Sequence, residues 1–172
     1  MVNPVRGIKL FENPILESLT QSPWYGIPLF NIPLICFLLY TAVENNYSLL
    51  QKIGIAIVGA FTWTWTEYTL HRFFFHGEDY WMDKLPHCKY VWYFHFLIHG
   101  IHHAFPQDHY RLVFPPIPGF FVLGIFGYLP IRMIVPADSL NFFYSGFLVG
   151  YIMYDMMHYF LHHSSPKEGS WW

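Results

Sequence analysis

Apolar residues gather in four stretches of this 172-residue chain, and polar segments separate them. In chain order the stretches are 26–43, 53–65 with an extension to 70, 117–131, and 140–154 with an extension to 157. A helix needs roughly 20 apolar residues to cross a bilayer, so the third and fourth stretches are marginal without their extensions. Pro130 is expected to break or kink the third helix near its end. We predict an all-α integral membrane protein with four transmembrane helices in two hairpins.

Composition supports the membrane assignment. The chain is 54% hydrophobic and only 12% charged, whereas soluble domains carry about 25% charged residues. A net charge of −2 and a pI of about 6.6 indicate no basic surface for nucleic acid. Cys36 and Cys88 are far apart in sequence, which excludes a disulfide framework. The length is that of one domain, which we expect to cover residues 1–172.

Cationic residues predict the orientation of the helices. With four spans, one face of the membrane receives Arg6, Lys9, Arg72, Lys84, Lys89, Arg111 and Lys167, and the short turns on the other face have only Lys52 and Arg132. Positively charged residues favour the cytoplasmic side. The polar segment from 71 to 114 lies on this cationic face. We therefore expect a cytosolic cap rich in histidine.

Histidines form three groups on that face. They are "HRFFFH" with His71 and His76, "HGIHH" with His99, His102 and His103, and "HYFLHH" with His158, His162 and His163. In a helix the members of the second group share one face, and so do His158 and His162. His71 and His76, five residues apart, require a helix that ends or distorts there.

Imidazole is a common ligand of iron, zinc, copper and nickel. One tetrahedral zinc site takes four ligands, so these seven histidines, with His163 set aside as turned away from the others, favour two metal ions. His87, His95 and His109 are interpreted as ordinary polar residues near the membrane surface. Glu67 and Asp155 each precede a candidate ligand by about one helical turn, and a ligating histidine usually donates its second N–H to a carboxylate or carbonyl.

Four motifs together carry a family resemblance: "HRFFFH", "HFLIHGIHH", "RLVFPP" and "YDMMHYFLHHSSPKEGS". They resemble those of the fatty acid 2-hydroxylases, within the membrane fatty acid hydroxylase and sterol desaturase superfamily. The resemblance begins near Asn3, includes "PWYGIPL" at 23–29, and continues to the end of the chain.

The resemblance implies a fold, a site and a reaction. The fold has four membrane helices and a cytosolic cap in the endoplasmic reticulum. The reaction is O2-dependent hydroxylation at carbon 2 of long and very long fatty acyl chains, free or in ceramide, for sphingolipid synthesis. The site holds two metal ions, iron in the active enzyme, although zinc can occupy it. Electrons are expected from a separate cytochrome b5 and its reductase, because this chain has no cytochrome b5 domain.

By motif, the resemblance also assigns the ligands. One metal corresponds to His71, His76, His99 and His103, and the other to His102, His158 and His162. Tyr154 and Asp155 match positions that line the substrate end. His95 matches a histidine of the motif that is not a ligand.

The chain departs from the family pattern at its end. A last "HxxHH" cluster is expected beyond "HYFLH", yet the sequence stops at Trp172. We expect a truncated gene model or a fragment whose C-terminal part is missing. Alternatives are an inactive membrane metal-binding or regulatory remnant, a minimal enzyme that completes its site otherwise, and a sister enzyme that oxidises a sterol or sphingoid lipid.

Overall fold

The computed structural model describes residues 9–42, 46–77, 84–85 and 88–164. All regular elements in these ranges are helical, which confirms the all-α prediction. They are α1 (Pro14–Ser18), α2 (Gly26–Thr41), α3 (Leu49–Thr69), the π-helical η1 (Leu70–Phe75), α4 (Lys89–His95), the π-helical η3 (Phe96–Gly100), α5 (Ile101–Ala104), α6 (Pro116–Val122), the π-helical η4 (Leu123–Tyr128), α7 (Leu129–Ile134) and α8 (Ala137–His163).

Helix α3 begins earlier than the apolar pattern predicts because Ser48 and Gln51 cap it reciprocally. The Gln51 backbone N–H donates to Ser48 Oγ at 3.3 Å, and the Ser48 backbone N–H donates to Gln51 Oε1 at 2.8 Å. This capping box satisfies two N–H groups that a helix otherwise leaves without partners. Residues 49–52, expected in a polar turn, therefore form the first turn of α3.

The third apolar stretch forms a continuous helical run through α6, η4 and α7. It extends over Pro116–Ile134, 19 residues with a mean hydropathy of 1.7, and within the described ranges it is the one helix long and apolar enough to cross a membrane. The helix is not interrupted at Pro130, which lies in the first turn of α7. The expected break at Pro130 is therefore wrong, because α7 directly continues the π-helical η4. Four spans stay a prediction.

Helix α8 packs chiefly against α3, and glycines let the two backbones touch. A Cβ on Gly146 would lie 1.8 Å from the Ala56 carbonyl oxygen, and a Cβ on Gly59 would lie 2.0 Å from the Phe143 carbonyl oxygen. Small residues allow this close approach between helices in a membrane. Next to the contact, the Trp63 ring meets the rings of Phe147 and Tyr151 at 5.1 and 4.9 Å.

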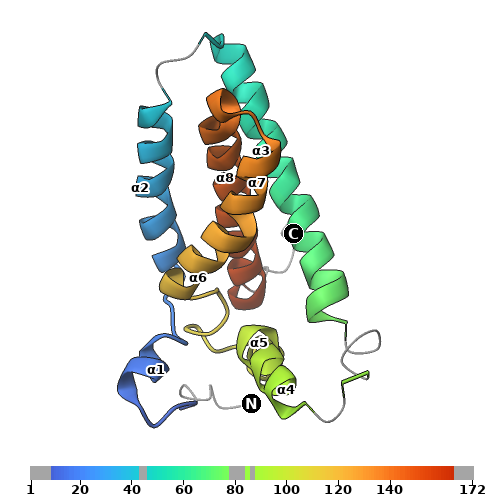
Figure 1. Ribbon diagram of the computed structural model, residues 1–172. Helices are drawn as coiled ribbons and strands as arrows, with labels where there is room; N and C mark the ends of the chain where they lie inside the picture. The colour runs from blue at the N-terminus through green and yellow to red at the C-terminus, as the bar shows by residue number, and fades with distance from the viewer. Residues whose placement is uncertain (1–8, 43–45, 78–83, 86–87, 165–172) are drawn as a thin grey trace, which may run out of the picture.

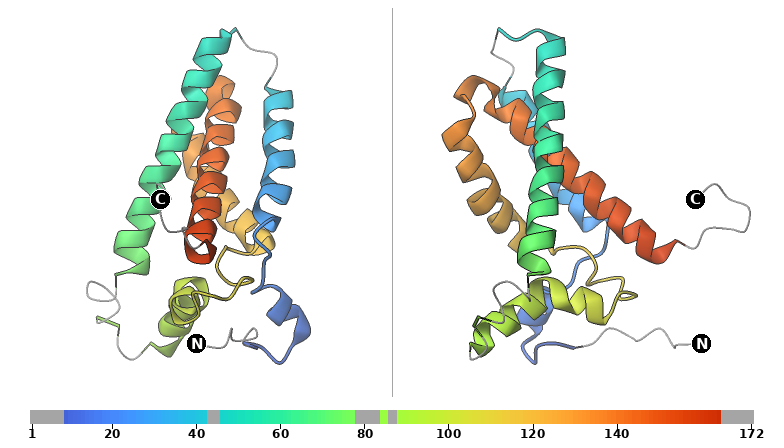
Figure 2. Two further views of the ribbon diagram at one scale, coloured as in Figure 1. Left: turned by 180° about the vertical axis from the view of Figure 1, so that it is seen from behind. Right: turned by 90° about the vertical axis from the view of Figure 1, so that its right-hand side faces the viewer.

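Helices α1, α4 and α5 gather at one end of the molecule, where α3 and α8 also end (Figure 1). The view from behind shows α3 and α8 side by side, and the side view shows them crossing above this cap (Figure 2). Many large apolar side chains face outward from the long helices, including Phe61, Trp65 and Phe126 with 71–74% of their surface exposed. Such an exterior is expected where the surroundings are lipid.

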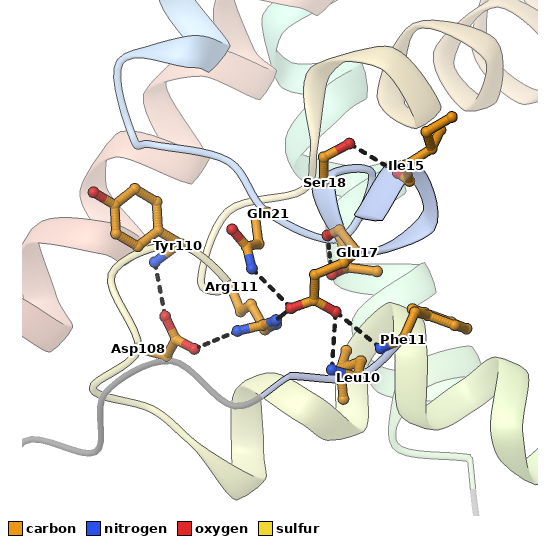
Figure 3. Close-up of polar contacts among 10 residues, drawn as sticks. Leu10, Phe11, Ile15, Glu17, Ser18, Gln21, Asp108, Tyr110 and Arg111 are labelled. Carbon is orange, nitrogen blue, oxygen red and sulfur yellow. Dashed lines mark hydrogen bonds and ion pairs between the residues drawn. The ribbon is translucent and has the colours of Figure 1, made fainter. Parts of the chain in front are cut away.

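A buried charge cluster ties α1 to the loop that joins α5 to α6 (Figure 3). The Arg111 guanidinium, whose side chain is 2% exposed, pairs with Glu17 and donates from Nη1 to Asp108 Oδ2 at 2.9 Å. Glu17 Oε2 also accepts hydrogen bonds from the backbone N–H groups of Leu10 and Phe11, each at 2.9 Å. Burial raises the pKa of Glu17, but these N–H donors and the Arg111 charge outweigh it, so the net pKa is lowered.

The same loop also contacts α8. The Ser22 backbone N–H on the α1 side donates to the Tyr110 carbonyl at 2.7 Å, and His109 Nδ1 lies 2.9 Å from Tyr159 Oη on α8. The loop is thus held between α1 and α8. "RLVFPP" returns the chain to the bundle, as the first residues of α6 show, but Arg111 in addition fixes the loop.

We predict that Gly146→Ala lowers the free energy of unfolding by about 3 kcal/mol, because the new methyl group must displace the α3 backbone. Gly54→Ala is the matched control: it lies on α3 with no atom within 4 Å of the added Cβ. Its expected effect is a gain of up to about 1 kcal/mol from helix propensity. Unfolding of the detergent-solubilised proteins measures both. Equal stability of the two variants would contradict the backbone contact.

Arg111→Leu is expected to cost about 3 kcal/mol, because it leaves two carboxylates in the protein interior without their cation. Combining it with Glu17→Gln and Asp108→Asn should recover part of that loss, since neutral amides no longer repel one another. Denaturant unfolding of the single and triple variants checks this. No recovery in the triple variant would mean that Arg111 stabilises the loop through packing alone.

Candidate metal centre

The end of α3 and the segment from α4 to α5 bring four histidines together. His71 Nε2 lies 3.2 Å from His76 Nε2, which lies 3.2 Å from His99 Nε2. His103 Nε2 extends the set at 2.9 Å from His99 Nε2. We call His71, His76, His99 and His103 the first imidazole group.

A second imidazole group joins α5 to α8. His102 Nε2 lies 3.1 Å from His158 Nε2, and the His102 and His162 rings have centroids 4.8 Å apart. One nitrogen from each of the three lies within 4.8 Å of the others, and the same holds for His71, His76 and His99. The adjacent residues His102 and His103 thus join different groups. All seven histidines expected as ligands fall into these two groups.

A π-helix resolves the five-residue spacing of His71 and His76. η1 continues α3, and the His76 backbone N–H donates to the His71 carbonyl at 2.9 Å. This bond from residue i+5 to residue i is the defining bond of a π-helix, a rare form that is frequent at functional sites. It brings the two rings to a centroid distance of 4.8 Å. The helix distortion that the sequence predicts between His71 and His76 is therefore a π-helical turn, which is wider than an α-helical turn.

Helix α8 continues without interruption to His163, past the fourth apolar stretch. His158 and His162 consequently lie one turn apart, with their rings stacked at 5.0 Å. The close contact between α8 and α3 places these rings beside the end of α3. Gln107 in the cap loop adds a weak bond, from its side-chain amide to the His162 carbonyl at 3.5 Å.

Burial keeps the central imidazoles uncharged. Desolvation, followed by the neighbouring histidines, lowers the pKa of His99 to about 3 and that of His102 to about 3. A metal ion binds neutral imidazole, so at neutral pH no proton competes at these two nitrogens. The first group is more open at its edge, since His76 and His103 are exposed.

Glu67 lies beside the first group as the sequence predicts. Its Oε1 is 3.6 Å from His71 Nδ1, and Tyr154 Oη is 3.4 Å from the same nitrogen. A carboxylate at Nδ1 favours the tautomer with the proton there and leaves Nε2 free as a ligand. Asp155 Oδ2 is buried and makes no hydrogen bond among the described residues.

Three further histidines lie outside the two groups. His95 is buried, with Nε2 2.6 Å from the Phe75 carbonyl oxygen. His109 and His163 meet at 3.9 Å between ring centroids, and His163 Nδ1 donates to the Tyr159 carbonyl at 3.0 Å. His87 lies outside the described residues.

His95, interpreted from the sequence as an ordinary polar residue near the membrane surface, is buried against Phe75. The buried pair of Arg111 with Glu17 matched no sequence pattern. In both cases the partner is a residue distant in sequence, so no local spacing reveals it.

The donor set suits divalent metal ions. Two nitrogen ligands of one tetrahedral zinc ion lie about 3.3 Å apart, since each is roughly 2.0–2.1 Å from the metal. The Nε2 pairs within the two groups lie 2.9–3.2 Å apart. A neutral imidazole carries a single N–H, so lone pairs that face one another need a shared proton or a cation between them. The two groups could hold metal ions.

Comparisons with known proteins agree with this arrangement. No family model matches the sequence. Fatty acid 2-hydroxylase of Mus musculus is 35% identical over 184 residues, covering 96% of this chain and 48% of its own length. Dihydroceramide fatty acyl 2-hydroxylase of Arabidopsis thaliana is 39% identical, covering 95% of this chain and 66% of its own length. Ceramide very long chain fatty acid hydroxylase of Schizosaccharomyces pombe is 42% identical, covering 90% and 42%.

A solved structure is also similar. It is described as full-length scs7p with only the hydroxylase domain visible, and it matches with a TM-score of 0.81 and 37% identity. The match covers 92% of this chain and 57% of that one. The chain spans about half the length of several of the curated relatives that it matches.

The fold is helical, and its imidazoles are grouped as they are in proteins that bind metal ions. Given the identities above along nearly the whole chain, it belongs to the fatty acid 2-hydroxylase family. The family resemblance predicted from the sequence motifs is thereby confirmed.

We predict that the purified protein binds two divalent metal ions per chain, because each imidazole group supplies at least three converging nitrogens. His158→Ala combined with His162→Ala should leave one ion, since a single ligand remains in the second group. Metal analysis after dialysis against Zn²⁺ or Co²⁺ measures the stoichiometry. His109→Ala is the control and should leave two ions. One ion in the parent protein would contradict the division into two groups.

Proposed function

We propose that this chain is the metal-binding hydroxylase domain of a fatty acid 2-hydroxylase. The reaction hydroxylates carbon 2 of long or very long fatty acyl chains, free or in ceramide, for sphingolipid synthesis. One observation carries the proposal: seven histidines from α3–η1, η3–α5 and α8 direct their nitrogens into two adjacent groups. The printed names of the relatives, fatty acid and ceramide hydroxylases, supply the substrate class.

In this proposal the first imidazole group holds one metal ion and the second holds the other. The ligands are those that the motifs assign, with His103 in the first group and His102 in the second. Bound iron would supply O2 activation, which an alkyl C–H bond requires because no acidic or basic side chain attacks such a bond. Zinc is also compatible with an all-imidazole donor set.

Other residues of the chain orient the ligands and the substrate. Glu67 and Tyr154 keep the His71 ring turned with Nε2 toward the group. The unpaired Oδ2 of Asp155 is a hydrogen-bond acceptor for the polar end of the lipid. An apolar cavity of about 290 Å³ between α2, α6 and α8, lined by Phe30, Phe120 and Tyr151, is suited to part of an acyl chain. Tyr151 lies one helical turn before Asp155 on α8.

The proposed setting is the endoplasmic reticulum membrane, with four spans and the imidazole groups on the cytosolic side. The apolar exterior of the long helices and the cationic residues of the cap support this orientation. Hydroxylation by O2 incorporates one oxygen atom into the lipid and reduces the other to water, so an electron pair must be supplied. We assign that role to a separate cytochrome b5 and its reductase.

The test is expression in a yeast host that lacks its own 2-hydroxylase, with 2-hydroxyacyl sphingolipids measured by mass spectrometry. The parent protein should restore them, and His102→Ala should lower them to roughly 1% or less, because even residues that only support metal ligands contribute 10–100-fold. His109→Ala, at matched expression, should behave like the parent.

Three other outcomes would overturn the proposal. Metal binding without any product would favour an inactive metal-binding protein. A differently oxidised lipid would favour a sister reaction. Full activity in His102→Ala would remove the assigned metal centre from the reaction.

A further inference from the structure

His95 connects the two segments that carry the first imidazole group. Its side chain is 7% exposed. Its Nε2 lies 2.6 Å from the carbonyl oxygen of Phe75, twenty residues earlier in the chain. A carbonyl oxygen only accepts, so the proton of this hydrogen bond belongs to His95 Nε2. That nitrogen is therefore committed to the backbone of another segment.

The carbonyl that accepts this hydrogen bond belongs to the residue just before a candidate metal ligand. Phe75 is the last residue of η1 and immediately precedes His76. Carbonyls in the last turn of a helix have no partner in a following turn and must find one elsewhere. The His95 N–H supplies that partner where the π-helix ends and the chain turns to present His76.

The side chain of Phe75 also contacts the segment that carries His99. The Phe75 ring stacks on the His99 ring, with centroids 4.7 Å apart and an angle of 13° between the planes. His95 and His99 are four residues apart, across the junction of α4 and η3. Together they hold Phe75 by its carbonyl and by its ring. One residue of η1 thus fixes the position of the segment that carries His99, His102 and His103.

We infer that His95 is a positioning residue that fixes the end of η1 against η3 so that His76 and His99 meet at one metal ion. The inference rests on the proposed metal centre and goes beyond it. His95 Nε2 is not available as a ligand, because its proton points to the Phe75 carbonyl. Without this bond the turn at 75–77 loses its anchor. Metal sites tolerate displacements of only about 0.5 Å in their ligands.

The test isolates the first group by replacing His158 and His162 with Ala, and titrates Co²⁺ into the detergent-solubilised full chain. In that background His95→Leu should weaken binding by about 10-fold or more, the range known for residues that orient metal ligands. His95→Gln should stay within about 3-fold of the background protein, because its amide N–H can donate to the same carbonyl. His109→Gln, at a histidine outside both groups and with a side chain that can still bond to Tyr159, is the control and should not weaken binding.

A second background separates positioning from general destabilisation. With His71 and His76 replaced by Ala, the first group retains only His99 and His103, the second group is complete, and there His95→Leu should leave Co²⁺ affinity unchanged. Equal losses in both backgrounds, unchanged affinity of His95→Leu in the first, or a loss with Gln as large as with Leu would each overturn the inference. Absence of Co²⁺ binding in the unmodified chain would instead overturn the proposed metal centre, and the inference with it.

Discussion

The direct contact of the α3 and α8 backbones is the constraint on which the site depends. Gly59 and Gly146 leave no room for a Cβ between the helices. The two helices are therefore locked in both separation and register. Because His71 follows the end of α3 and His158 lies near the end of α8, the crossing also fixes how far apart these imidazoles emerge. A displacement of one helix turn at the glycines would move a histidine by about 5 Å.

The segment from α4 to the loop before α6 brings the remaining imidazoles, and buried polar contacts fix it in addition to the apolar packing of Ile101 and Val113. Arg111, Glu17 and Asp108 anchor its loop to α1, and His95 anchors its helical part to η1. Buried polar groups are costly unless they are paired, so such contacts tolerate few alternative arrangements. The cap thus has a specific geometry although much of its surface is exposed.

The positions of the two imidazole groups follow from the α3–α8 crossing and from the polar contacts of the cap. The first group combines the π-helical end of α3 with the segment of His99 and His103, and the second combines His102 with α8. His102 and His103 of "HGIHH" belong to different groups. The two groups are therefore adjacent and are joined through the short helix α5. The two sets of converging nitrogens therefore lie close together at one end of the helices.

The sequence alone predicted the helical class, the seven histidines that converge and the proximity of Glu67 to His71, because all of these follow from local composition and from spacing along a helix. It predicted a distortion between His71 and His76 but not that this is a π-helix. It missed the early start of α3 and the continuity of the helix through Pro130. The motif resemblance also implied how these histidines divide between two groups, and the nitrogen distances show the same division. Only the tertiary structure decided which partners Arg111 and His95 take. These depend on residues that are distant in the chain and meet only when the α3–α8 crossing closes, and no periodicity encodes such contacts.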